Sequence, residues 1–132
     1  MEAFHEAIKN RDWDGLATLM TEDIVFRSPV VYAPYHGRGT VISLLTHVAE
    51  IFDDFHYVRK MENEETNDLA LVFRARVGTR EIEGCDFLHL NEEGLIDELF
   101  VMIRPLSGAH AVRDAIGTRL ETAEGKQATV SR

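Results

Sequence analysis

Asp86 is the residue in this sequence whose surroundings most favour chemistry. It lies in the stretch Glu83 to Leu90, EGCDFLHL, where the other residues have the pattern of a buried strand. Burial disfavours the charged form of a carboxyl group and raises its pKa, so a buried Asp86 would be neutral and could donate a hydrogen bond. The alternative is an ionised Asp86 that forms a salt bridge with Arg74 or Arg76 on the preceding strand.

The register of the strands decides between these two states of Asp86. Apolar side chains alternate from Leu69 to Val77 and form the inner face of this strand, so that Arg74 and Arg76 fall on its outer face. A shift of one residue in the turn around Gly78 reverses the face on which Asp86 lies. The pattern alone therefore leaves both orientations open.

Two other clusters carry side chains that could react or bind a metal. Cys85 and His89 share one strand face, but their Cα atoms would be about 13 Å apart, too far for a nucleophile and its base. His47 and Glu50 are three residues apart on a predicted helix, yet a third ligand and a recognised zinc pattern are missing. We expect inert packing at Cys85, a solvated helix face at His47, and neither a metal nor a cofactor.

Length and composition predict one domain. The chain has 132 residues, and we assign residues 1–117 to the domain and 118–132 to a mobile tail. A net charge of −9 argues against nucleic acid and anionic membranes as partners. A single cysteine and the absence of a long apolar N-terminal stretch favour a reducing cytoplasm.

The spacing of apolar residues predicts four helices. The first includes Phe4 to Ile8, and the second is short, is capped by Asp12 and continues to Met20. The main helix covers Thr40 to Phe52 and has one apolar face. The last helix covers Ser107 to Ile116.

Alternating apolar residues predict the strands. A short strand at Asp23 to Ser28 follows the first two helices. After the main helix come a weaker strand at Tyr57 to Asn63 and three strong ones at Leu69 to Val77, Ile82 to Leu90 and Leu95 to Ile103. Helices followed by an antiparallel sheet give an α+β fold in which a curved sheet wraps around a long helix.

This order of elements, with the motifs DWDGLATLM, TEDIVFRSP, HGRG and CDFLHLNEEG, resembles the NTF2-like superfamily. That superfamily includes the SnoaL-like polyketide cyclases and the ketosteroid isomerases. The resemblance implies a cystatin-like/NTF2-like cone, a homodimer formed through the outer face of the sheet, and an apolar pocket between sheet and helices.

The resemblance to the isomerases covers only part of their catalytic machinery. Asp86 matches the acid that donates a hydrogen bond to the developing oxyanion, which implies that it faces the pocket. Ser28, before Pro29, is found where the isomerases have their general base, and Phe4 is found where they have a tyrosine. Serine cannot abstract a carbon-bound proton without a base, so we do not expect steroid isomerisation by that mechanism.

We therefore predict a pocket protein that binds a compact, apolar, carbonyl-containing molecule. If it is an enzyme, it would be an isomerase, cyclase or hydratase with Asp86 as the acid or hydrogen-bond donor. The alternative is a non-catalytic, dimeric adaptor module whose core is filled by its own side chains. The predicted ligand-binding residues are Phe4, Ile8, Phe26, Ser28, Tyr32, Leu45, Val48, Phe73, Leu88, Leu99 and Val101.

Overall fold

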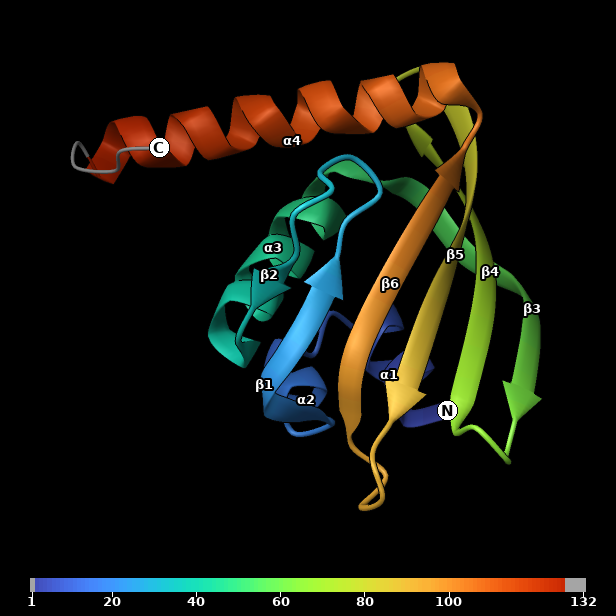
Figure 1. The fold of residues 1–132 in the computed structure, drawn as a ribbon. Coiled ribbons are helices and arrows are strands. Elements are labelled where there is room, and N and C mark those ends of the chain that lie inside the picture. Colours follow the sequence, from blue (N-terminus) through green and yellow to red (C-terminus); the bar gives the residue numbers. More distant parts are fainter. Residues whose placement is uncertain (1, 128–132) are drawn as a thin grey trace.

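The structure, a computed structural model, describes residues 2–127 and has the predicted α+β architecture. Four helices accompany one curved sheet of six strands (Figure 1). Residues 128–132 of the predicted tail lie outside the described residues, and helix α4 continues past the predicted domain boundary at residue 117. The helices are α1 (Glu2–Lys9), α2 (Trp13–Ala17), α3 (Arg38–Ile51) and α4 (Leu106–Gln127).

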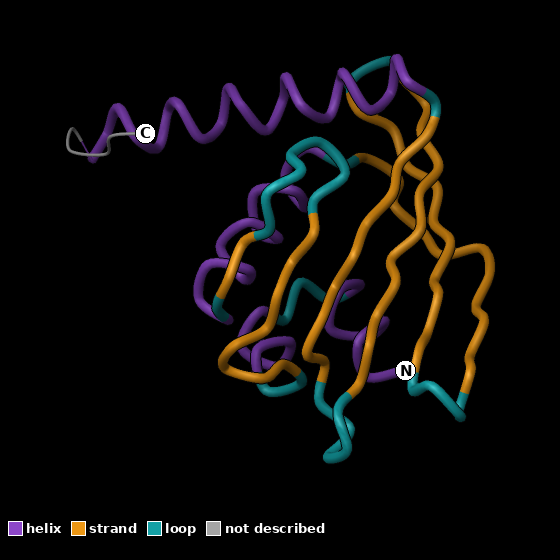
Figure 2. The backbone as a smooth tube through the Cα atoms, viewed as in Figure 1, coloured by secondary structure: helices purple, strands orange, loops and turns teal. Residues whose placement is uncertain are grey.

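The sheet has the strand order β2-β1-β6-β5-β4-β3. Strands β3 to β6 form the predicted antiparallel meander, whereas β1 runs parallel to β6. The concave side faces α1 and α3, and α4 crosses one end of the sheet, as the backbone trace shows (Figure 2). The strands are β1 (Met20–Arg27), β2 (Tyr35–His36), β3 (Asp53–Asn63), β4 (Asp68–Val77), β5 (Arg80–Leu90) and β6 (Ile96–Arg104).

The predicted boundary between the second helix and the first strand was wrong. Asp12 does cap α2, its side chain accepting a hydrogen bond from the amide of Gly15 at 3.0 Å. The helix nevertheless ends at Ala17, and Met20 begins β1, where it pairs with Ile96 and is 1% exposed. Helical spacing alone did not reveal this pairing, because it depends on a strand far along the chain.

The two-residue turn between β4 and β5 fixes the register that the sequence left open. Val77 pairs with Arg80, and Gly78 at the turn has a φ of +60°, which glycine adopts without strain. This register places Asp86 opposite Leu71 on β4 and opposite Val101 on β6. Asp86 therefore lies on the buried face of the sheet.

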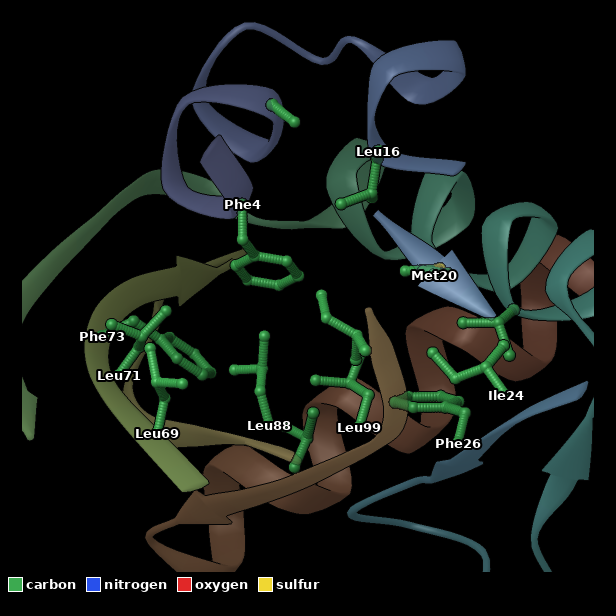
Figure 3. Packing of buried hydrophobic residues seen from close by; sticks show 14 of the residues in the cluster. Phe4, Leu16, Met20, Ile24, Phe26, Leu69, Leu71, Phe73, Leu88 and Leu99 are labelled. Atoms are coloured by element: carbon green, nitrogen blue, oxygen red, sulfur yellow. The ribbon is translucent and has the colours of Figure 1, made fainter. Parts of the chain in front are cut away.

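The concave face of the sheet and buried residues from all four helices form the core (Figure 3). Alternate residues of β4, from Leu69 to Val77, are buried as the sequence predicted. Phe4 from α1 packs toward this face and is 1% exposed. None of the helices in the described part of the chain is long and apolar enough to cross a membrane.

Candidate functional site

A cavity of about 720 Å³ lies between the concave face of the sheet and helices α1, α3 and α4. Its inner wall is apolar and includes Phe4, Phe26, Phe73 and Leu99. Helix α4 contributes Val112 and other residues near its middle, and so helps to enclose the space. A hollow of this size is typical of a site for a small organic molecule.

Asp86 is the one buried charged residue of the described chain, with 8% of its surface exposed, and it lines the cavity. The hydroxyl of Tyr57 donates a hydrogen bond to its Oδ2 at 2.7 Å. Among the described residues no other hydrogen bond reaches the carboxyl group, so Oδ1 has no protein partner there. A ligand in the cavity could therefore bind this oxygen.

Burial raises the pKa of Asp86 to about 6, although the hydrogen bond from Tyr57 acts in the opposite direction. The pKa of Tyr57 is raised well above its ordinary value by burial and by the neighbouring carboxylate. At pH 7 a group with a pKa of about 6 is about nine-tenths ionised. The pKa of Asp86 is thus raised in the expected direction. The neutral acid is nevertheless the minor form at pH 7, because the hydrogen bond from Tyr57 stabilises the carboxylate.

The salt bridge that was the alternative for Asp86 does not form. Arg74 instead binds Glu83, Nε to Oε2, at 3.0 Å, and Arg76 lies 3.8 Å from Asp54. Both arginines project from the exposed face of β4, as its alternation predicts. No described cationic side chain lies beside the carboxyl group of Asp86.

Tyr57 is a site residue that the sequence analysis missed. It lies on β3, two strands away from Asp86, and its ring contacts those of His5, Phe55 and Phe73 at centroid distances of 4.8, 5.1 and 6.5 Å. Register shifts between Asp53 and His56 and between Tyr57 and Arg59 interrupt this strand. The alternation of Phe55 and Tyr57 with polar neighbours was the available signal for an inward-facing phenol.

Ser28 also lines the cavity, at the end of β1. Its Oγ accepts hydrogen bonds from the amides of Val30 and Val31 at 3.0 and 3.3 Å. The oxygen is therefore occupied as an acceptor, and only the hydroxyl proton remains for a ligand or a water molecule. Ser28 is a possible donor and cannot be a base.

Most of the predicted lining residues meet at this one cavity, and two lie elsewhere. Tyr32 is fully exposed on the loop after β1, and Leu88 is 1% exposed within the core without bordering the cavity. Their roles in ligand binding are not supported by these positions. The residues that do line the cavity are Phe4, Ile8, Phe26, Ser28, Leu45, Val48, Phe73, Asp86, Leu99 and Val101.

The other candidate reactive side chains are the two histidines, which bind other groups, and Cys85, a free thiol on the face of β5 opposite to Asp86. His89 binds Asp97 at 2.7 Å on the outer face of the sheet, and burial raises the pKa of the Cys85 thiol. His47 accepts a hydrogen bond from Arg119 of α4 at 3.3 Å. Among the side chains that the structure describes, those of residues 2–119, no group of three or more His, Cys, Asp or Glu could hold a metal ion.

Comparisons with known proteins agree with this architecture. The family model of the SnoaL-like domain matches residues 1–99. A steroid delta-isomerase from Pseudomonas aeruginosa is 38% identical, with 92% of this chain and 89% of that chain covered and a TM-score of 0.88. A bacterial protein with a cystatin-like fold from Silicibacter pomeroyi is 35% identical, with 92% and 84% covered and a TM-score of 0.86.

A more distant likeness extends the fold comparison. An NTF2-like protein from Cytophaga hutchinsonii is 20% identical, with 78% of this chain and 85% of that chain covered and a TM-score of 0.62. At this identity the likeness concerns the fold alone. A comparison with curated proteins finds no match.

Proposed function

The chain belongs to the SnoaL-like domain family, and from this membership and the geometry of the cavity we propose that it binds a compact, largely apolar molecule with a carbonyl group. The observation that carries the proposal is a carboxyl oxygen, Oδ1 of Asp86, that lies on the wall of an apolar cavity and has no partner among the described residues. A carboxyl oxygen that faces an apolar cavity gains free energy when a ligand in the cavity forms a hydrogen bond with it. The steroid delta-isomerase that this chain resembles is consistent with a small-molecule ligand.

In the proposed complex, protonated Asp86 donates a hydrogen bond from Oδ1 to the ligand carbonyl while Oδ2 accepts from Tyr57. With a pKa of about 6, protonating the carboxyl at pH 7 costs about 1.4 kcal/mol. A hydrogen bond in a water-excluding cavity can offset a cost of this size. Polarisation of a carbonyl in this way would promote isomerisation, cyclisation or hydration, with Asp86 as the acid.

The general base of such a reaction is not assigned. Ser28 cannot fill this role because its Oγ already accepts two backbone hydrogen bonds. The proposed activity therefore depends on Asp86, which is the one buried ionisable carboxyl group in the described part of the cavity wall.

The adaptor alternative predicted a core filled by its own side chains. A cavity of about 720 Å³ counts against that alternative and in favour of ligand binding. A reducing cytoplasm stays the predicted location, since Cys85 is the single cysteine of the chain.

We also propose that two copies pair through the outer face of the sheet. Phe87 and Met102 are 39% and 52% exposed there, and the ring of Phe87 lies 6.1 Å from that of Phe100. Light scattering should report a dimer for the wild type and a monomer for Phe87→Lys, with Leu106→Lys on α4 as the control. A wild type that is monomeric at micromolar concentration rules out the pairing.

Thermal-shift screening tests the ligand proposal. Lactones, steroid enones and polyketide-like phenols would be screened against the wild type and Asp86→Leu, with Asp23→Leu on the exposed side of β1 as the matched control. We expect at least one carbonyl compound to stabilise the wild type and Asp23→Leu, with a smaller effect on Asp86→Leu, because leucine cannot donate a hydrogen bond to the carbonyl. If no compound raises the melting temperature of the wild type, the proposal fails.

A further inference from the structure

The residues that line the cavity divide by exposure into an apolar interior and a charged rim. Phe4, Phe73, Leu99 and Val112 are buried and belong to the interior. The exposed lining residues come from α1, the turn after it, the loop after β1, the start of β3 and the middle of α4, and most are polar. We call the three basic ones, Lys9, Arg11 and Arg113, the cationic rim.

The rim has the opposite charge to the molecule as a whole. The chain has a net charge of −9, yet the lining contains three basic side chains and, apart from Asp86, one carboxylate, that of Asp54. Asp54 lies 3.8 Å from Arg76, outside the cavity lining, so its charge is already compensated in part. The side chains that line the mouth of the cavity therefore include more positive than negative charges.

The rim cations are only partly engaged by protein groups. Lys9 has no ion-pair partner among the described residues. Arg113 contacts the adjacent Asp114 at 3.2 Å, and both side chains are more than half exposed.

Arg11 is the most constrained member of the rim. Its Nη2 donates to the carbonyl of Ala49 at 3.1 Å, and its Nη1 lies 3.6 Å from Glu50. The bond to Ala49 joins the turn after α1 to α3 and fixes the guanidinium at the mouth.

We infer that the ligand carries a carboxylate at the end opposite its carbonyl group, and that this carboxylate binds the cationic rim. The inference rests on the proposed function, since it assumes that the carbonyl end reaches Asp86. An anion could not enter the interior, because burial without a counter-ion is unfavourable and the charge of Asp86 would repel it. A carboxylate that stays at the mouth keeps its water and gains the attraction of Lys9 and Arg113.

The orientation of the ligand follows from this division. The apolar body fills the interior, the carbonyl lies at Asp86, and the carboxylate remains at the exposed mouth. A neutral molecule of the same shape would use the interior equally well but would gain nothing from the rim. The cationic rim would thus select keto acids over neutral ketones.

A matched pair of probes tests this selection by calorimetry: 6-acetyl-2-naphthoic acid and its neutral analogue 6-acetyl-2-naphthamide. The two molecules share the aromatic body and the carbonyl and differ only in the charge at the far end. We expect the acid to bind the wild type about tenfold more tightly than the amide, since each exposed ion pair contributes modestly. The advantage should shrink as salt is added.

The variant is Lys9→Gln combined with Arg113→Gln, and the control is Arg59→Gln combined with Arg80→Gln. The control also removes two positive charges, but from exposed positions outside the cavity lining. The variant should weaken binding of the acid about fivefold or more while leaving binding of the amide unchanged, and the control should change neither.

Three results would count against the inference, and they are distinguishable. If both probes bind the wild type with equal affinity, or if the variant and the control behave alike toward the acid, the rim does not select a carboxylate, although the proposed function survives. If neither probe binds the wild type, the cavity does not accept such a molecule, and the proposed function fails together with the inference.

Discussion

Replacing Asp86 by Asn should stabilise the protein at neutral pH and have a much smaller effect in acid. The carboxyl of Asp86 has a pKa of about 6 in the folded chain, and we take the ordinary value of 3.8 for the unfolded chain. The folded state therefore holds a proton that the unfolded state releases between these two values. Stability must fall as pH rises through this window, because the folded state binds more protons there.

The size of the effect follows from the shift in pKa. A difference of about 2 units corresponds to about 3 kcal/mol of lost stability once the pH is well above the folded pKa. About 2 kcal/mol of this loss falls between about pH 4.5 and about pH 7.5, where most domains are still folded. Asparagine has nearly the shape of aspartate and no charge, so Asp86→Asn should recover most of that amount at the upper pH.

Urea unfolding at several pH values measures this difference directly. The free energy of unfolding of Asp86→Asn minus that of the wild type should rise with pH by about 2 kcal/mol, equivalent to about 8 °C in melting temperature. Asp23→Asn, which removes an exposed carboxylate from β1, is the control. A difference for Asp86→Asn that is flat or falls with pH would refute the claim that burial raises the pKa of this carboxyl.

Three further substitutions test the supports of the site. Tyr57→Phe removes the hydrogen bond that favours the carboxylate, so the pKa of Asp86 should rise by about one unit or more in a carbon-detected NMR titration, and an unchanged pKa would contradict its role. Gly84→Ala should lower the free energy of unfolding by about 1–3 kcal/mol, because its Cβ would lie 2.7 Å from a carbonyl oxygen of β6 and against a ring of β4. Gly39→Ala, where a Cβ meets no atom, is its control, and equal losses at both sites would refute the packing argument. Asp12→Ala should lower stability by about 1 kcal/mol through loss of the α2 cap, and no loss in urea unfolding would show that the cap is not needed.

The fold was predictable from the sequence where residues near in the chain determine the structure. The alternation of apolar residues in β4 gave both the strand and its buried face, because side chains on a strand point to opposite sides in turn. Asp12 signalled the start of α2 for a similar reason, since a cap needs only the first turn of its own helix. The end of α2 was missed because Met20 pairs with Ile96, a contact that no local pattern reveals.

The short strand β2 was missed for the same physical reason. Its residues Tyr35 and His36 pair with Phe26 and Val25, and a strand of two residues shows no alternation of its own. The sequence suggested only a loop with aromatic residues at this place. Pairing with β1, and not propensity, makes this segment extended.

The sequence was sufficient to identify Asp86 as a site residue, but it did not reveal that Tyr57 is its hydrogen-bond partner. The carboxylate was recognised because it interrupts an apolar run within one strand. Tyr57 was not, because its contact with Asp86 joins β3 to β5 across the intervening β4, and register shifts in β3 precede and follow it. The cations of the rim were missed because Lys9 and Arg113 come together only when α1 and α4 border the same cavity.

The stability cost at Asp86 itself argues for a function. The strand register could have placed a guanidinium beside this carboxylate, but Arg74 binds Glu83 on the outer face, and its side chain is 60% exposed. An apolar residue at position 86 would suit its neighbours Leu71 and Val101, which are both buried. The chain instead keeps an ionisable group that Tyr57 satisfies at one oxygen only, next to a cavity that could admit a partner for the other. A polar group that weakens the fold and faces an open cavity is what a binding site requires, and this combination is not expected of a residue that serves only the core.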